Sequence, residues 1–166
     1  MKSLLALLLA SIIFGMSPVK AENSISKMTP EKLHSVISGY AEDVEPSNNV
    51  ISFKYKSIPV YCIWDVKADR MRLISPIVQV SDLTPEHLNV ALQANYHTVL
   101  DARYAIGDGI MYAAFIHPLS SMNKAELESA VRQVATAALT FGDSYSSGEL
   151  VFPQQSQKSP QRGKEL

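Results

Sequence analysis

The hydrophobic and polar positions are most regular between Leu83 and Pro118, where a helical repeat changes into a two-residue repeat. Thr84 followed by Pro85 is typical of a helix start. Apolar or small residues then recur at helical spacing, at Leu88, Ala91, Leu92, Asn95 and Val99. Alternating runs lie on both sides of Gly107-Asp108-Gly109, which is typical of a tight β-hairpin. The segment therefore predicts an amphipathic helix followed directly by a hairpin.

Both faces of the second hairpin strand are apolar, so alternation alone leaves its orientation open. One set is Tyr112, Ala114 and Ile116, which we expect to face the core, and the other set is Met111, Ala113 and Phe115. If Met111, Ala113 and Phe115 face outward, they form an apolar interaction surface for a partner. The alternative is that the last helix or the tail covers them.

Two further segments read as helices. Thr29-Pro30-Glu31 repeats the capping pattern of Thr84-Pro85, and the apolar stripe behind it predicts a helix from about Pro30 to Asp43. Asn123 with Glu126 three residues later is typical of a capping box, and it predicts a third helix that ends near Gly142.

Three strands are expected between the first two helices, at residues 50–56, 60–66 and 70–80. Pro76 interrupts the third, so this strand lies at an edge, is bulged or ends early. The order is then α-β-β-β-α-β-β-α, with short turns that favour antiparallel neighbours. The sequence therefore predicts an α+β fold, a two-layer sandwich of an antiparallel sheet and helices.

The first residues have the pattern of a secretory signal, because Lys2 precedes an apolar run from Leu4 to Phe14 that is short for a membrane span. We expect cleavage after Ala21, and hence a periplasmic or secreted protein. The alternative is an uncleaved anchor. Residues 22–142 suit one domain, and the Gly, Ser, Gln and Pro content of residues 143–166 predicts a disordered tail.

Charge argues against some partners. The formal net charge is −1, and cleavage after Ala21 removes Lys2 and Lys20 but no acid, which makes it −3. Binding to nucleic acid or to an anionic membrane needs clustered Lys and Arg. We therefore expect no nucleic-acid partner and no membrane association after cleavage.

Residues able to carry chemistry are few and scattered. Cys62 is the single cysteine, and alternation with Val60 and Trp64 favours an inert core thiol, with a reactive or intermolecularly paired thiol as the alternative. Among the four histidines only His97 has a carboxylate four residues away, at Asp101, as a metal pair on a helix would. No nucleophile elbow, zinc-binding helix or phosphate-binding loop occurs. We predict no catalytic residue, no cofactor and no metal site.

Particular residues within this order resemble the YbjN-like family, which shares its fold with the small type III secretion chaperones. They are Leu88-Asn89, Asn95, Ala102-Arg103-Tyr104-Ala105-Ile106, Asp108-Gly109 and Tyr112-Ala113-Ala114-Phe115. The resemblance covers residues 29–141 and rests on structural motifs. It implies a non-enzymatic module that binds protein segments or acts in regulation, often as a homodimer, with no catalytic residue to carry over.

Two functions follow as expectations. The first is an exported, chaperone-like binding module whose partner is a second copy or a segment of another envelope protein. Tyr61, Tyr96, Met111 and Phe115 are the outward aromatic and methionine residues that we expect to serve it. The second is a small periplasmic enzyme with a site assembled from residues distant in sequence.

Overall fold

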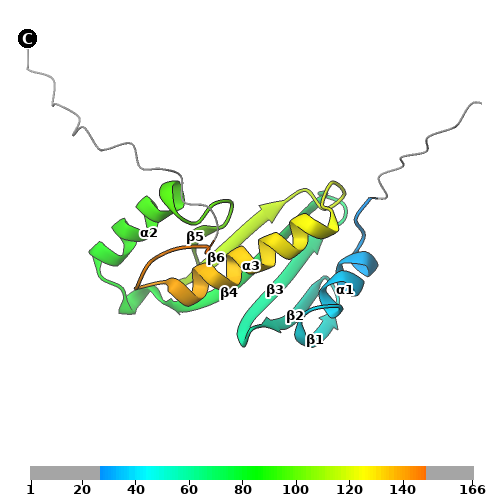
Figure 1. The fold of residues 1–166 in the computed structure, drawn as a ribbon, viewed down its shortest axis with the longest axis horizontal. Helices are drawn as coiled ribbons and strands as arrows, with labels where there is room; N and C mark the ends of the chain where they lie inside the picture. The colour runs from blue at the N-terminus through cyan, green and yellow to red at the C-terminus, as the bar shows by residue number, and fades with distance from the viewer. Residues whose placement is uncertain (1–26, 149–166) are drawn as a thin grey trace, which may run out of the picture.

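The computed structural model of the chain describes residues 27–148 (Figure 1). Its elements are α1 (Pro30–Ser38), β1 (Glu42–Ser47), β2 (Val50–Tyr55), β3 (Ile58–Asp65), β4 (Arg70–Gln79), the 3-10 turn η1 (Val80–Asp82), α2 (Pro85–His97), β5 (Arg103–Gly107), β6 (Ile110–His117) and α3 (Lys124–Thr140). The expected signal segment lies outside the described residues, as do residues 149–166. Within the described part no helix is long and apolar enough to cross a membrane.

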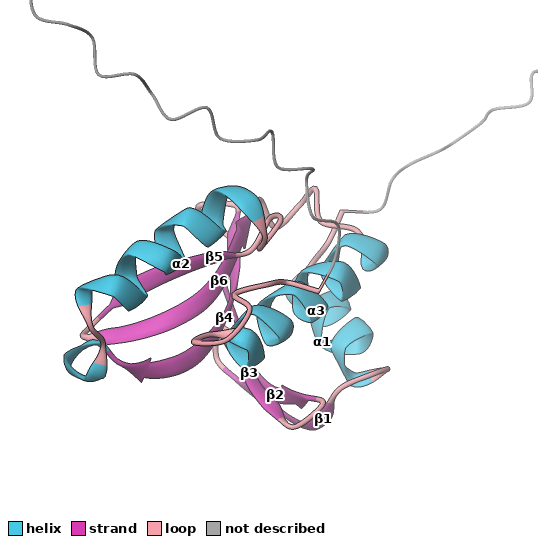
Figure 2. Cartoon of the chain, turned by 60° about the vertical axis from the view of Figure 1, so that its left-hand side comes forward, coloured by secondary structure: helices cyan, strands magenta, loops and turns pink. Residues whose placement is uncertain are grey.

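The six strands form one antiparallel sheet in the order β1-β2-β3-β4-β6-β5. Helix α3 runs across the middle of the sheet, α1 lies over the β1 end, and α2 lies beside β5 (Figures 1 and 2). The expected α+β sandwich is confirmed. The sheet has one strand more than expected, which makes the order α-β-β-β-β-α-β-β-α.

The additional strand is β1, in a segment that the sequence assigned to the end of the first helix. Helix α1 stops at Ser38, and its carbonyls at Val36 and Ile37 accept the N–H of Gly39 at the helix end. Strand β1 is exposed along nearly its whole length, so no alternation marks it. Its single half-buried residue, Val44, lies four residues after Tyr40 and so appeared to continue the helical stripe.

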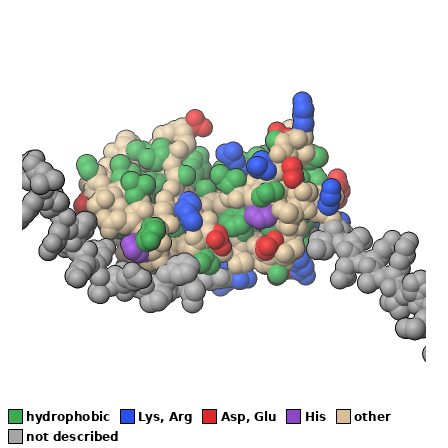
Figure 3. All heavy atoms as spheres, turned by 90° about the horizontal axis from the view of Figure 1, so that it is seen from above, with side chains coloured by type: hydrophobic (Ala, Val, Ile, Leu, Met, Phe, Trp, Pro, Cys, Tyr) green, Lys and Arg blue, Asp and Glu red, His purple; other side chains and the backbone are tan. Residues whose placement is uncertain are grey.

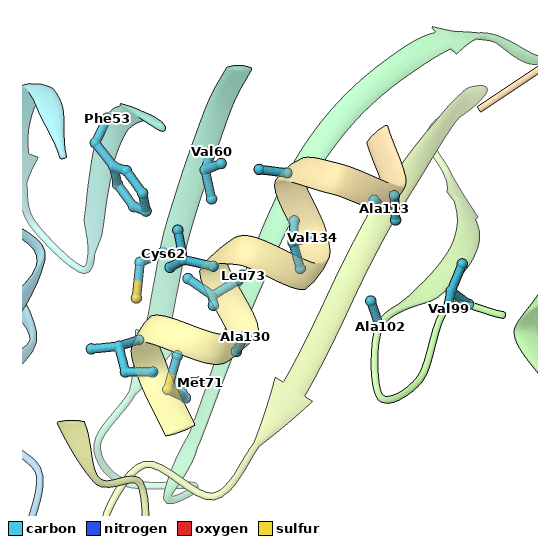
Figure 4. Packing of buried hydrophobic residues seen from close by; sticks show 14 of the residues in the cluster. Phe53, Val60, Cys62, Met71, Leu73, Val99, Ala102, Ala113, Ala130 and Val134 are labelled. Carbon is cyan, nitrogen blue, oxygen red and sulfur yellow. The ribbon is translucent and has the colours of Figure 1, made fainter. Parts of the chain in front are cut away.

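The core lies between the sheet and α3 (Figure 4). Cys62 and Leu73 are fully buried on the sheet face below α3, and Ala130 and Val134 of the helix are fully buried against it. Burial raises the pKa of the Cys62 thiol to about 12. A thiol with so high a pKa stays protonated, which agrees with the expected inert core cysteine.

The buried stripes of α2 and α3 differ from those expected. Leu92 and Leu139, which the helical pattern placed inside, are each 68% exposed. Ala91 is buried as expected, and other alanines are buried with it, at Ala94 of α2 and at Ala130, Ala135 and Ala137 of α3. Small side chains let a helix approach its neighbours closely, so the contact face turned toward the alanines.

The hairpin turn at Asp108-Gly109 and the bulge after Pro76 agree with what the sequence predicted. Asp108 and Gly109 have φ of 50° and 76°, as a two-residue hairpin turn requires, and Gly109 meets this at no steric cost. Strand β4 is bulged between Pro76 and Val78, so a proline is accommodated in a central strand. Of the three outcomes expected for Pro76, the bulge is the one observed.

A short strap after α3 is ordered, contrary to the expected disorder from residue 143. Tyr145 and Ser147 are buried, and the Ser147 N–H donates to the Thr98 carbonyl over 3.1 Å. The rings of Tyr104, Phe141 and Tyr145 pack edge to face or tilted, with centroids 5.1–5.8 Å apart. The strap thus joins the end of α3 to the end of α2, which the polar composition of the segment did not reveal.

One residue on the outer edge of β5, Tyr104, has its backbone groups covered by a side chain. Asn95 of α2 accepts a 2.7 Å hydrogen bond from the Tyr104 N–H and donates a 3.1 Å bond to the Tyr104 carbonyl. These bonds replace those that a neighbouring strand would make. An edge strand paired in this way is protected from adding a further strand.

Replacing Asn95 should therefore be costly. Asn95→Ala leaves two backbone groups of Tyr104 without these partners, and we expect it to lower the free energy of unfolding by about 1–3 kcal/mol. Asn95→Asp keeps the acceptor but not the donor, so we expect its free energy of unfolding to lie between those of the unaltered protein and of Asn95→Ala. Urea denaturation measures both, with exposed Asn89→Ala on the same helix as control. Equal stability of Asn89→Ala and Asn95→Ala would contradict this account.

The turn between β3 and β4 is held to the loop before α3 by one carboxylate. Asp69 accepts hydrogen bonds from the Ser120 N–H over 2.7 Å and from the Ser120 hydroxyl over 2.8 Å. These donors stabilise the charged form and lower the pKa of Asp69 below its usual value. Ser120 also accepts a bond from the N–H of Met28, so the start of the described chain is fixed at the same place.

This contact predicts a pH dependence of stability. A lowered folded-state pKa means that the Asp69 contribution is complete above the unfolded pKa, about 4, and is lost as pH falls through the folded value. Asp69→Asn should therefore reduce the melting temperature at pH 7 and have a smaller effect at pH 2. The control is Asp108→Asn, at a turn position that asparagine tolerates. A loss that is the same at both pH values would show that the carboxylate charge is irrelevant.

Candidate functional site

The expected interaction surface lies on the covered face of the hairpin. Met111 and Ala113 are 3% and 0% exposed, and Phe115 is half-buried against the core. Ala113 pairs with the buried Ser75 and Phe115 with the buried Leu73, so all three residues point toward the α3 side. The orientation expected for β6 was therefore wrong, and the set expected in the core, Tyr112, Ala114 and Ile116, faces outward.

The outward side chains of three neighbouring strands form an apolar area on the sheet face opposite α3. We call this area the apolar strip, and its members are Tyr61, Ile63, Ile74, Tyr112, Ala114 and Ile116. None of them belongs to the core cluster. Tyr61 is 37% exposed and Ile116 is 63% exposed. Apolar side chains grouped on an exposed sheet face are typical of an interaction surface.

The register fixes how the strip is arranged. Tyr61 of β3 pairs with Ile74 of β4, which pairs with Ala114 of β6. In the next row Ile63 pairs with Arg72, and Arg72 pairs with Ile116. A hollow of about 440 Å³ adjoins Tyr61 between β1 and β3. The strip is thus interrupted by one cation and has a depression at its β1 side.

This face carries charges of both signs, and Lys54 pairs with Glu42 and Asp65 with Arg70 across neighbouring strands. The basic residues Arg70, Arg72 and Arg103 lie on β4 and β5, and all three are exposed. The acidic residues Glu42 and Glu45 lie on β1 at the other side of the sheet. A partner segment that crosses the strip therefore meets cations at the β4–β5 side, which favours acidic residues there.

The sheet edges are poorer candidates for binding than the face. Asn95 occupies the Tyr104 backbone groups on β5, as described above. On the other edge, β1 is bulged between Glu42 and Glu45, contains Pro46 and has Asp43 at φ of 52°. Prolines, charges and bulges on an edge oppose strand addition.

A second candidate site is a hollow of about 400 Å³ beside the end of β6. Its lining residues come from three separate parts of the chain and are Asp101, Phe115, Ile116, His117, Glu126, Ser129 and Gln133. Figure 3 shows one face of the molecule on which a histidine, hydrophobic side chains and acidic side chains lie together. We call this feature the β6 hollow.

The side chain of Gln133 connects two parts of the wall of the β6 hollow through hydrogen bonds. Its side-chain oxygen accepts hydrogen bonds from the N–H groups of Asp101 and Ala102 over 3.0 and 3.2 Å, and its amide donates to the Ser129 hydroxyl over 3.2 Å. Gln133 is only 3% exposed. Gln133 was not among the residues expected to form a site, although a glutamine beside the apolar stripe of a helix is a signal for a buried hydrogen-bonding role.

The pair His97 and Asp101 does not form the metal pair that helical spacing suggested. Helix α2 ends at His97, whose ring packs on Tyr96, whereas Asp101 follows the helix and lines the β6 hollow. Among the described residues, no three His, Cys, Asp or Glu side chains are placed to hold a metal ion.

No protein-family model matches the sequence, and no curated protein matches it at a significant level. Among solved structures, the chain is similar to a chain in the structure of the HopA1–SchA chaperone–effector complex, with a TM-score of 0.52 and 12% sequence identity. The likeness covers 66% of this chain and 88% of that chain. At this identity it shows a common fold and not a common activity. The chain therefore shares the fold of that chain.

Proposed function

We propose that this protein is a non-enzymatic, chaperone-like binding module, related to the YbjN-like proteins, that holds an extended segment of another envelope protein on its apolar strip. The strip is the observation that carries the proposal, because it presents apolar side chains from β3, β4 and β6 on a face that α3 leaves free. The chaperone-like fold supports the same class of function. The expected enzyme has less support, since no nucleophile and base among the described residues are paired in either candidate site.

The partner segment should combine apolar and acidic residues. Its apolar side chains would cover Tyr61, Ile74 and Ile116, and its carboxylates would pair with Arg72 and Arg103. Both sheet edges are protected, so the segment would bind across the face and not as an added strand. A second copy of this chain is the competing occupant.

Fluorescence anisotropy with labelled peptides tests the strip. We expect peptides with alternating leucine and glutamate to bind, and peptides with lysine in place of glutamate to bind more weakly. Ile116→Glu should weaken binding at least tenfold, because it buries a charge against the apolar peptide. Leu139→Glu is the matched control, since Leu139 is 68% exposed but lies on α3. Equal effects of the two substitutions would rule out the strip.

Light scattering on the same variants separates the two occupants. A monomer that binds peptide supports a segment of another protein. A dimer that Ile116→Glu dissociates, with no peptide bound, would identify a second copy as the occupant instead.

Export is part of the proposal and needs its own test. If residues 1–21 are a cleaved signal, protein recovered from the cell envelope should begin at Glu22 in intact-mass analysis. Recovery of the full-length chain from the cytoplasm would contradict both cleavage and the envelope partner.

A further inference from the structure

The β6 hollow has a lining that the binding of an extended segment to the strip does not explain. Asp101 and Glu126 contribute carboxylates from two separate segments of the chain. Asp101 lies in the loop after α2, and Glu126 lies in the first turn of α3. Among the described contacts, no ion pair engages either carboxylate. The lining includes no lysine or arginine. Glu126 Oε2 accepts a 3.1 Å hydrogen bond from the Asn123 N–H, and no cationic side chain of the lining pairs with either carboxylate.

The histidine adds a further acceptor. His117 Nδ1 lies 2.8 Å from the Pro118 carbonyl oxygen. A carbonyl oxygen can only accept, so Nδ1 carries a proton, and Nε2 is the acceptor nitrogen when the ring is neutral. The Phe115 and His117 rings are stacked, with centroids 5.9 Å apart and planes inclined by 15°. Aromatic faces beside carboxylates attract cations.

The hydrogen bonds around the hollow also remove competing donors. The Gln133 amide is used by Ser129, and Gln133 holds the N–H groups of Asp101 and Ala102. Arg103, two residues from Asp101, donates to the carbonyls of Leu100 and Ala102. None of these hydrogen bonds engages the side-chain carboxylate of Asp101 or Glu126.

We propose that the β6 hollow binds an organic cation, an ammonium or guanidinium group carried on an aliphatic stem. Such a group has donors and no acceptors, which matches the carboxylates of Asp101 and Glu126 and the free nitrogen of His117. The stem lies against Phe115 and Ile116. The cation belongs either to a free amine or to a lysine or arginine side chain of a protein segment.

Titration of the purified protein followed by ¹⁵N–¹H NMR tests this site. The probes are agmatine, which is a free guanidinium amine, and the blocked peptide acetyl-glycyl-arginyl-glycinamide. We expect saturable shifts of the Asp101 and Ala102 amide signals, because both N–H groups bond to Gln133 in the wall of the hollow. Asp101→Asn and Glu126→Gln should each raise the dissociation constant about tenfold. Glutamine at position 126 can still cap Asn123.

Asp108→Asn is the control, since it removes the same charge at the opposite end of the hairpin from His117. It should change the dissociation constant less than twofold. Binding of agmatine supports a site for the free cation, and binding of the peptide alone supports a site for a protein side chain. Shifts that do not saturate with either probe overturn the proposal, as does an equal loss in Asp101→Asn and Asp108→Asn, which would indicate unspecific attraction to surface charge.

Discussion

The close approach of α3 to the middle of the sheet is the contact on which the rest of the structure depends. Ala130 and Ala137 are fully buried at this contact, together with Val131 and Val134. Each fully buried valine or leucine contributes about 1.5–3 kcal/mol, and small side chains between them let helix and sheet meet without voids. With one cysteine and no disulfide, this packing supplies the main stabilisation of the fold.

One layer of helices on a six-stranded sheet leaves the two edge strands and the opposite face of the sheet without a covering helix. The edges are protected by local devices, Asn95 on β5 and a bulge with Pro46 on β1. The opposite face carries the apolar strip, with Arg72 within it and Arg103 on β5 beside it. Features that oppose strand addition at the edges would also oppose a partner that bound there as an added strand. The face is therefore the surface on which recognition should occur.

The sequence predicted the parts of the fold that follow from local chemistry. Thr84, Asn123 and the Asp108-Gly109 turn act as their patterns indicated, since caps and turns involve neighbours in the chain. It missed β1, because an exposed edge strand has no alternation to detect. It also placed β6 the wrong way round, because Tyr112 and Met111 are both apolar and only the neighbours of the strand in the sheet decide which one is buried.

The candidate sites depended on the same missing information. Met111, Ala113 and Phe115 lie on the covered face of β6, and the proposed apolar strip uses the alternate positions of the same strand. The β6 hollow could not be predicted at all, because Asp101, His117 and Glu126 belong to different elements and no spacing relates them. Gln133, which joins two of these elements, looked like one more polar residue of a helix.

The strip and the hollow meet at Ile116, which belongs to both. Arg72 lies beside Ile116 in the sheet and favours an acidic group, whereas the hollow at the other side of Ile116 favours a basic one. Opposite preferences at adjacent positions discriminate between registers, since a segment shifted by a few residues would bring like charges together. An apolar strip alone would bind many segments with little selectivity. The paired charge preferences at the end of β6 would make this face selective for a segment that carries an acid and a base on either side of an apolar residue.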